Sequence, residues 1–371
     1  MIIGSAFDLG LKMNLTKAIA LDLKTNKAYL NTFFNYLVTI LFLSLLFSLT
    51  LFSIKTFLLN YFDNLDRVAL NYAFTIFCFY FVAHHLSMCF MTFFEGLSDF
   101  KSSFYLKFTK SLFSNLLPIL GIYIMQESNF LLFLNFTLAG HFIGLLILFL
   151  FLFFKQKQNI INTNFYLFSV ENFRSILKLS IHIFLNSLFG ILFMQLINIY
   201  VFSNFDNQVS NLFKIINMLL AYINQFFASM FMIILPIFSM ETYKNLKNEV
   251  RKIFLLNFFL SGIAYSLFYY SYILLIPLFF SEIQFTINNS FIIYLIAGYF
   301  LSTSKFPLVL SSIAFENPQI ISIHNGVNFL IIIGSMLYLN PSNIVMIAQI
   351  FFFSQLISYF FLLISWKTYF K

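Results

Sequence analysis

The sequence predicts an all-α integral membrane protein with about ten transmembrane helices. Three observations lead to this prediction. Of the 371 residues, 61% are hydrophobic and only 9% are charged, whereas soluble domains contain about 25% charged residues. The apolar residues form long runs of about 20, the length that a helix needs to cross a bilayer core. Helices are expected in these runs because unpaired backbone groups are too costly in hydrocarbon.

Each apolar run is bounded by a short polar segment, so the runs define the expected spans in order. We expect spans at residues 30–53, 69–93, 104–125, 130–154, 176–202, 211–239, 253–280, 288–315, 320–339 and 342–365. The longest polar segment between spans is 155–175. It predicts a cytoplasmic linker between an N-terminal helical bundle, 1–154, and a C-terminal helical bundle, 176–371.

The basic residues predict the orientation of these spans. Loops on one side hold most of the 21 lysines and arginines, while loops on the other side hold Lys55, Arg67 and Lys214. Because cytoplasmic loops are enriched in basic residues, both termini are expected on the cytoplasmic side. The net charge of +8 comes mostly from this asymmetry, so a nucleic-acid partner is not expected.

Weak internal similarity predicts two pseudo-symmetric bundles on a six-plus-six plan. Lys24 corresponds to Lys244 at a shift of 220 residues, and Glu95 corresponds to Glu316 at a shift of 221. On this plan, residues 1–19 are the cytoplasmic half of a helix. We therefore expect an N-terminally truncated chain that lacks the first helix and half of the second, through a misassigned start codon, a damaged gene or a tolerated loss.

One lysine is expected near the middle of the bilayer. Lys305 lies about ten residues, and so about 15 Å, inside the span that ends near Phe315, and the repeat places His84 at the equivalent depth. A charge at this depth must face a partner or a wet cavity, which predicts a substrate-binding role for both. Pro307 is expected to loosen the helix and free a carbonyl towards such a cavity. The alternatives are a snorkelling or deprotonated Lys305 and a His84 that packs as a neutral imidazole.

A second group of polar residues begins the C-terminal bundle. Arg174, Lys178, His182 and Asn186 are spaced four apart, which keeps them on one side of a helix. Arg and Lys bind phosphate well, so these residues predict a track for an anionic substrate that enters from the cytoplasmic leaflet. The alternative is that Arg174 and Lys178 are only anchors at the membrane surface.

Acidic residues fall mostly in loops or at helix ends. Asp8 is the exception, and with Lys12 four residues later it predicts an ion pair that serves coupling or structure. No metal-ligand spacing, phosphate loop or nucleophile elbow occurs, so we expect no metal, no cofactor and no enzyme. An interior with buried basic residues suits an anion better than a cationic drug.

Several motifs occur in an order that resembles the lipid-linked oligosaccharide flippases, which export O-antigen and related polysaccharides. They are "FDLGL" with "LTKAIA", "FFEGLSDF", and "FMQLINIYVFSNFDNQVSNLFKI" after the polar linker. This family belongs to the superfamily of multidrug, oligosaccharidyl-lipid and polysaccharide exporters. Asn198 departs from the pattern, because related proteins often have an aspartate there, and the departure weakens a cation-coupling role for that position.

The resemblance implies a function in surface polysaccharide or lipopolysaccharide biosynthesis. The expected activity is translocation of a polyprenol-diphosphate-linked oligosaccharide across a bacterial inner membrane by alternating access. The implied partners are this substrate, membrane lipids and the polysaccharide polymerase machinery. Lys305 and His84 would hold the diphosphate or acidic sugars, and Arg174 with Lys178 would collect the substrate. The alternatives are a multidrug or small-molecule exporter of the same superfamily and an inactive truncated paralogue.

Overall fold

The computed structural model describes residues 10–60, 67–125, 130–162, 170–240, 243–279, 289–315, 317 and 319–369. In this part of the chain every regular element is an α-helix. Within the described ranges, ten helical stretches are long and apolar enough to cross a membrane. The predicted all-α fold with about ten spans is confirmed, and the protein is a multi-pass membrane protein.

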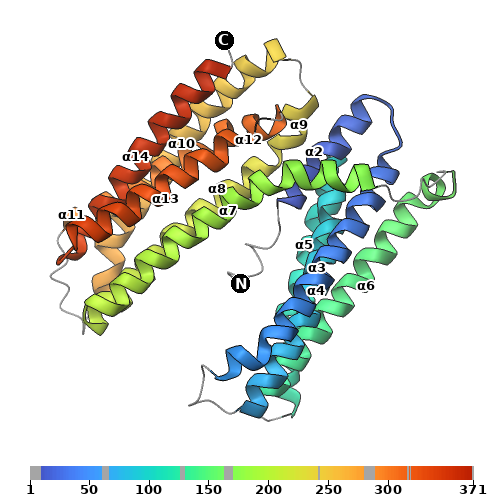
Figure 1. The fold of residues 1–371 in the computed structure, drawn as a ribbon, viewed down its shortest axis with the longest axis horizontal. Coiled ribbons are helices and arrows are strands. Elements are labelled where there is room, and N and C mark those ends of the chain that lie inside the picture. The colour runs from blue at the N-terminus through green and yellow to red at the C-terminus, as the bar shows by residue number, and fades with distance from the viewer. Residues whose placement is uncertain are drawn as a thin grey trace. The chain divides into compact units, whose positions relative to one another are not determined.

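The helices are named in chain order (Figure 1). They are α2 (Leu11–Lys24), α3 (Tyr29–Asn60), α4 (Arg67–Gly96), α5 (Phe100–Met125), α6 (Phe130–Asn162), α7 (Val170–Asn204), α8 (Asn207–Met232), α9 (Ile234–Met240), α10 (Tyr243–Phe279), α11 (Asn289–Ser304), α12 (Phe306–Ala314), α13 (Gln319–Leu339) and α14 (Ile344–Tyr369).

The described chain divides into two compact units. The first unit ends at Ser180 and the second begins at Ile181, so the division falls within α7. The expected linker 155–175 is partly helical, because α6 continues to Asn162 and α7 begins at Val170. The predicted bundles 1–154 and 176–371 and the repeat that relates them stay predictions.

In the first unit, α4 is the central helix. It packs against α2, α3, α5 and α6, and Figure 1 shows α3 to α6 running side by side. Leu15 of α2, Phe33 of α3 and Phe93 of α4 are fully buried in one apolar cluster. The segment 1–19, expected to be half a membrane helix, is described only from Gly10, and α2 is a helix of 14 residues.

A glycine of α6 lets α5 and α6 come into close contact. A Cβ atom at Gly140 would collide with the carbonyl oxygen of Phe113, whereas one at Gly144 would make an ordinary contact, 3.5 Å from Cγ of Lys110. Small residues at a helix interface let two backbones approach. Gly140 therefore permits the close spacing of these two helices.

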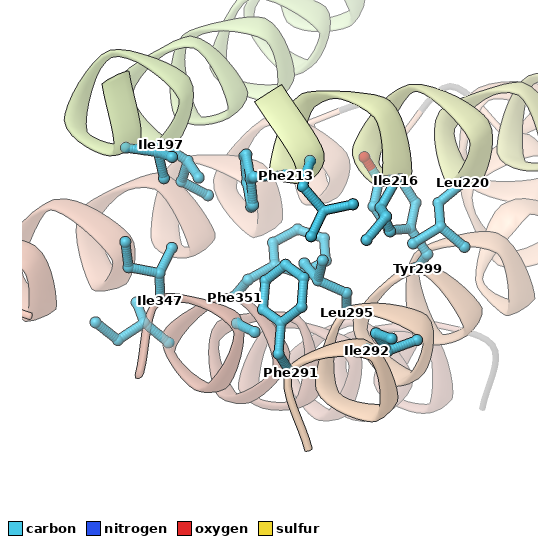
Figure 2. Packing of buried hydrophobic residues seen from close by; sticks show 14 of the residues in the cluster. Ile197, Phe213, Ile216, Leu220, Phe291, Ile292, Leu295, Tyr299, Ile347 and Phe351 are labelled. Atoms are coloured by element: carbon cyan, nitrogen blue, oxygen red, sulfur yellow. The ribbon is translucent and has the colours of Figure 1, made fainter. Parts of the chain in front are cut away.

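In the second unit, α7, α8, α11 and α14 meet at a cluster of large apolar side chains. Figure 2 shows Phe213 and Ile216 of α8 facing Phe291 and Leu295 of α11, and Phe351 of α14 belongs to the same cluster. Lipid is as apolar as these side chains, so close packing between them, rather than escape from water, holds the helices together.

Two of the ten spans are interrupted helices. The expected span 211–239 is broken at Ile233, between α8 and α9, and the expected span 288–315 is broken at Lys305, between α11 and α12. A proline follows each break within three residues, Pro236 in the first case and Pro307 in the second. The short helices α9 and α12 pack against each other. The predicted spans exist, and the interruption at Lys305 lies beside Pro307, which was expected to loosen the helix.

Candidate functional site

The second unit contains a cavity of about 460 Å³. Helices α7, α8, α11, α12, α13 and α14 all contribute side chains to it. The polar lining of this cavity, which we call the amide cavity, consists mainly of carboxamides with two lysines among them; the polar residues are Asn186, Asn198, Asn217, Asn224, Asn325, Gln355, Lys214, Lys305, Ser302 and His324. Tyr299 and Phe351, both labelled in Figure 2, add aromatic surface. Among the described residues that line the cavity, none is acidic.

Lys305 is the buried lysine of this lining, whereas Lys214 is exposed. Its residue surface is only 7% exposed. The ammonium donates a hydrogen bond to Oε1 of Gln355 at 3.0 Å, and Nζ lies 3.5 Å from Nε2 of His324. The hydroxyl of Ser358 lies 2.6 Å from the same His324 nitrogen. An ammonium has three donors, and neither Gln355 nor His324 carries a negative charge, so the lysine is held in place but its charge is not neutralised.

The break in the helix positions Lys305. α11 ends one residue before Lys305 and α12 begins one residue after it. The sequence predicted that Pro307 would free a carbonyl towards a cavity. The structure corrects this expectation, because Nδ2 of Asn257 donates to the carbonyls of both Thr303 and Ser304, at 2.9 and 3.2 Å.

Further carboxamides of the cavity are tied to neighbouring side chains. The Tyr299 hydroxyl donates to Oδ1 of Asn217, and Thr303 donates to Oδ1 of Asn224 at 2.9 Å. Oδ1 of Asn198 is buried without a hydrogen-bond partner. The sequence held too many asparagines to choose among, and these contacts identify which of them share one cavity.

The four residues of the predicted track all lie on α7, but their surroundings differ. Arg174 and Lys178 are exposed. Nδ1 of His182 lies 3.5 Å from Oγ of Ser322, and Nδ2 of Asn325 donates to Oδ1 of Asn186 at 2.6 Å. The two exposed residues are free to meet a ligand, while the two inner residues contact α13. Their role as a substrate track stays a prediction.

His84 lies in an aromatic group of the first unit. Its ring stacks on Tyr80, with the ring centroids 5.6 Å apart, and His85 and His141 lie 5.6 and 6.2 Å away. Nδ1 of His84 is buried without a hydrogen-bond partner. His84 and Lys305 belong to different units, and the substrate-binding role of His84 stays a prediction. Within the described residues, no group of three or more His, Cys, Asp or Glu side chains could hold a metal ion.

A buried carboxylate of the first unit was missed from the sequence. Glu95 accepts from Ser103 at 3.3 Å and pairs with Lys107 at 2.5 Å. Lys12 lies 3.9 Å from the same carboxylate. The sequence had paired Lys12 with Asp8, which lies outside the described residues. Because Glu95 ends α4, its position resembled that of a solvated helix end, and the sequence carried no local signal of its burial.

A neighbouring carboxylate marks the start of α5. Asp99 accepts from the backbone N–H of Ser102 at 3.2 Å and forms an ion pair with Lys155 of α6. Partial burial opposes the ionisation of Asp99. The hydrogen bonds from Lys155 and Ser102 outweigh that effect and hold its pKa below the ordinary value.

Comparison with known proteins identifies the family. Residues 5–242 match the family described as polysaccharide biosynthesis protein. No curated protein sequence matches the chain significantly.

Solved structures with the same fold are transporters. A MATE structure in the straight conformation has a TM-score of 0.84, at 13% identity over 100% of this chain and 85% of that chain. A multidrug resistance MATE family transporter of the MOP superfamily, in its outward-facing conformation, has a TM-score of 0.79, at 13% identity over the same shares.

A third similar structure has a different binding pocket. It is a MOP superfamily transporter from Pyrococcus furiosus Vc1, described as having a pocket of reverse polarity, with a TM-score of 0.78 at 12% identity over 99% of this chain and 85% of that one. Because the family match covers more than half of the sequence, the chain belongs to the polysaccharide biosynthesis protein family, and its fold is that of the MOP superfamily transporters.

Proposed function

We propose that the protein translocates a polyprenol-diphosphate-linked oligosaccharide from the cytoplasmic to the periplasmic leaflet of a bacterial inner membrane. The observation that carries this proposal is the buried Lys305 in a cavity whose described lining residues include a second lysine, Lys214, and six carboxamides but no carboxylate. A charge within the membrane is costly unless it meets a partner or a wet cavity, so a fixed ammonium with neutral partners favours an anionic ligand.

The remaining lining suits the glycan part of such a substrate. Each carboxamide offers both donors and acceptors, as sugar hydroxyls do, and can exchange bonds with water for bonds with a sugar. Tyr299 and Phe351 offer flat apolar surface to the faces of sugar rings. The match to the polysaccharide biosynthesis family supports a glycan rather than a small inorganic anion.

We further propose that the exposed basic residues of α7 are the first to bind the substrate. With both termini in the cytoplasm, as the basic loops predict, Arg174 and Lys178 meet the diphosphate at the cytoplasmic surface. The polyprenol chain stays in lipid. The two units then expose the cavity to one side of the membrane and to the other in turn, as in other transporters with related halves. In this mechanism the protein binds and moves its substrate and breaks no covalent bond of it.

Small-molecule export is the second candidate, because the fold is shared with a multidrug resistance MATE transporter. A cationic drug would need a carboxylate partner inside the membrane. Among the described residues that line the amide cavity there is none, which favours the glycolipid diphosphate.

The test deletes the gene and measures polyprenol-diphosphate glycan on the two faces of the inner membrane. Complementation uses the unaltered chain, Lys305→Met, and Lys252→Met as a matched control. Lys252 suits this purpose because it pairs with Glu249 on the exposed surface of α10. We expect glycan to be trapped on the cytoplasmic face in the deletion strain and in Lys305→Met, and to be released by the other two.

Two outcomes contradict the proposal. Unchanged glycan distribution in the deletion strain would contradict glycan translocation. It would favour small-molecule export, or a chain without transport activity. Full export by Lys305→Met, at a membrane protein level equal to that of the unaltered chain, would remove Lys305 from the site.

A further inference from the structure

The break between α11 and α12 leaves two carbonyl groups without helical donors. Proline has no N–H, so Pro307 cannot donate to the carbonyl of Thr303 four residues earlier. The N–H of Leu308 would normally bond the carbonyl of Ser304. It bonds the carbonyl of Lys305 instead, at 3.0 Å. Both carbonyls belong to a membrane span, where an unsatisfied carbonyl is costly.

One side chain from a neighbouring helix satisfies both carbonyls. Asn257 of α10 is fully buried, and its Nδ2 lies 2.9 Å from the carbonyl oxygen of Thr303 and 3.2 Å from that of Ser304. A carboxamide NH₂ group has two hydrogens, so it can serve two acceptors at once. The number of donors that Asn257 offers therefore equals the number of carbonyls that the break orphans.

The Thr303 side chain connects this point to the wall of the cavity. Its hydroxyl lies 2.7 Å from the hydroxyl of Tyr265 on α10, and it donates to Oδ1 of Asn224 on α8 at 2.9 Å. Asn224 lines the amide cavity. The break is thus held from α10 on one side and α8 on the other, and Lys305 is the next residue but one after Thr303.

We propose that Asn257 is a positioning residue for Lys305. By satisfying the two carbonyls, it fixes the backbone of the break in the one arrangement that directs the lysine side chain into the cavity and towards Gln355. Without the amide, the carbonyls need other donors, and the break must change its dihedral angles to reach them. The proposal rests on the proposed function only in taking the amide cavity as the substrate site.

Cysteine labelling tests the positioning without any substrate. The two native cysteines are replaced by Cys78→Ser and Cys89→Ala, and Lys305→Cys then reports the direction of the break through its rate of reaction with a small charged methanethiosulfonate. Met218→Cys is the matched reporter, because Met218 lines the same cavity from α8. Asn257→Leu is then introduced beside each reporter, since leucine keeps the approximate size of the side chain and removes its donors.

We expect Asn257→Leu to change the labelling rate at position 305 by about tenfold, the factor that corresponds to one or two lost buried hydrogen bonds. The rate at position 218 should stay nearly the same. An unchanged rate at 305, or an equal change at both positions, would overturn the proposal, since the second result indicates general loosening. If the leucine variant does not reach the membrane, Asn257→Ser retains one donor and should give a smaller change in the same direction.

Pro307→Ala provides a rescue that a general structural role would not give. Alanine restores an N–H at position 307, which can donate to the carbonyl of Thr303 within the helix. In this background Asn257→Leu should alter labelling at position 305 less than it does beside proline. If Asn257→Leu changes labelling at position 305 as much in the Pro307→Ala background as in the unaltered chain, Asn257 does not act by satisfying the two carbonyls.

Glycan export by Asn257→Leu separates the two proposals. Reduced export, together with the altered labelling, supports both. Altered labelling at 305 with normal export leaves the positioning role intact and argues against a role for Lys305 in translocation.

Discussion

Glu95 in the first unit and Lys305 in the second unit are both buried charges, but their partners differ in kind. Glu95 has Lys107 at 2.5 Å, Lys12 at 3.9 Å and the Ser103 hydroxyl at 3.3 Å. Lys305 has a neutral carboxamide at 3.0 Å and a histidine at 3.5 Å. A charge that already has counter-charges serves to hold helices together. A charge that lacks one inside the protein is available to a ligand that brings it.

Reversing the sign of the charge at position 305 in the second unit is expected to have the largest effect on glycan export. Lys305→Glu places a carboxylate among amides, where it repels a diphosphate instead of attracting it. We expect glycan export to fall by about a hundredfold, the size of a lost charge-assisted contact with added repulsion. Export is measured as glycan reaching the periplasmic face at equal protein levels. Export above the level of Lys305→Met would contradict an anionic substrate.

Supplying an internal counter-charge should give Lys305 an ion-pair partner, as Glu95 has in the first unit. Gln355→Glu puts a carboxylate where the amide oxygen now accepts from Lys305 at 3.0 Å. The resulting ion pair would hold the ammonium more tightly and compete with the substrate, so we expect about tenfold lower export with no loss of thermal stability. Gln355→Leu is the control, because it removes the acceptor without adding charge. Full export by the glutamate variant would show that the ammonium need not be free.

Removing the charge in the first unit should affect stability rather than transport. Glu95→Gln keeps the shape of the side chain but leaves Lys12 and Lys107 without their counter-charge. We expect a loss of about 1–3 kcal/mol in the free energy of unfolding, measured by denaturant titration in detergent. Glu249→Gln is the matched control, because Glu249 pairs with Lys252 on the exposed surface. An export defect in Glu95→Gln at full stability would assign this site a role in transport.

The exposed ion pair between Asp99 and Lys155 should give the smallest effect. Asn also caps helices, so Asp99→Asn removes the charge and keeps the cap on α5. The folded pKa of Asp99 is lowered, so its contribution is present above the unfolded value near 3.9 and is lost as the pH falls through the folded pKa.

We therefore expect Asp99→Asn to lose only about 0.2–1 kcal/mol at pH 7, as for other exposed pairs. The difference between the variant and the unaltered protein should shrink as the pH is lowered below 4. Thermal unfolding scans at several pH values measure it. A difference that persists in strong acid would show that the charge of Asp99 is not its cause.

The helices could be predicted from the sequence, and the contacts between them mostly could not. Apolar runs define a membrane span by length alone, so all ten stretches were found. The break at Lys305 had a local signal in Pro307, but the residue that satisfies its carbonyls, Asn257, lies on another helix with no pattern to mark it. Glu95 was missed for the same reason, since Lys12 is far from it in sequence.

The candidate site was predicted in part. Lys305 was identified from its depth in the membrane, a property that the sequence contains directly. The carboxamides around it could not be identified from the sequence, because asparagine is abundant throughout the chain. Only the packing of six helices brings a few of them to one cavity. The substrate-binding roles of His84 and of the four α7 residues stay predictions, although the structure now shows which side chains surround them.

The glycine contact of α6 restricts how the first unit can change shape. Gly140 lies against the backbone of Phe113, so no side chain separates the two helices at that point. Sliding α5 along α6 would drive a neighbouring side chain into that backbone. We therefore expect α5 and α6 to move together when the first unit changes shape.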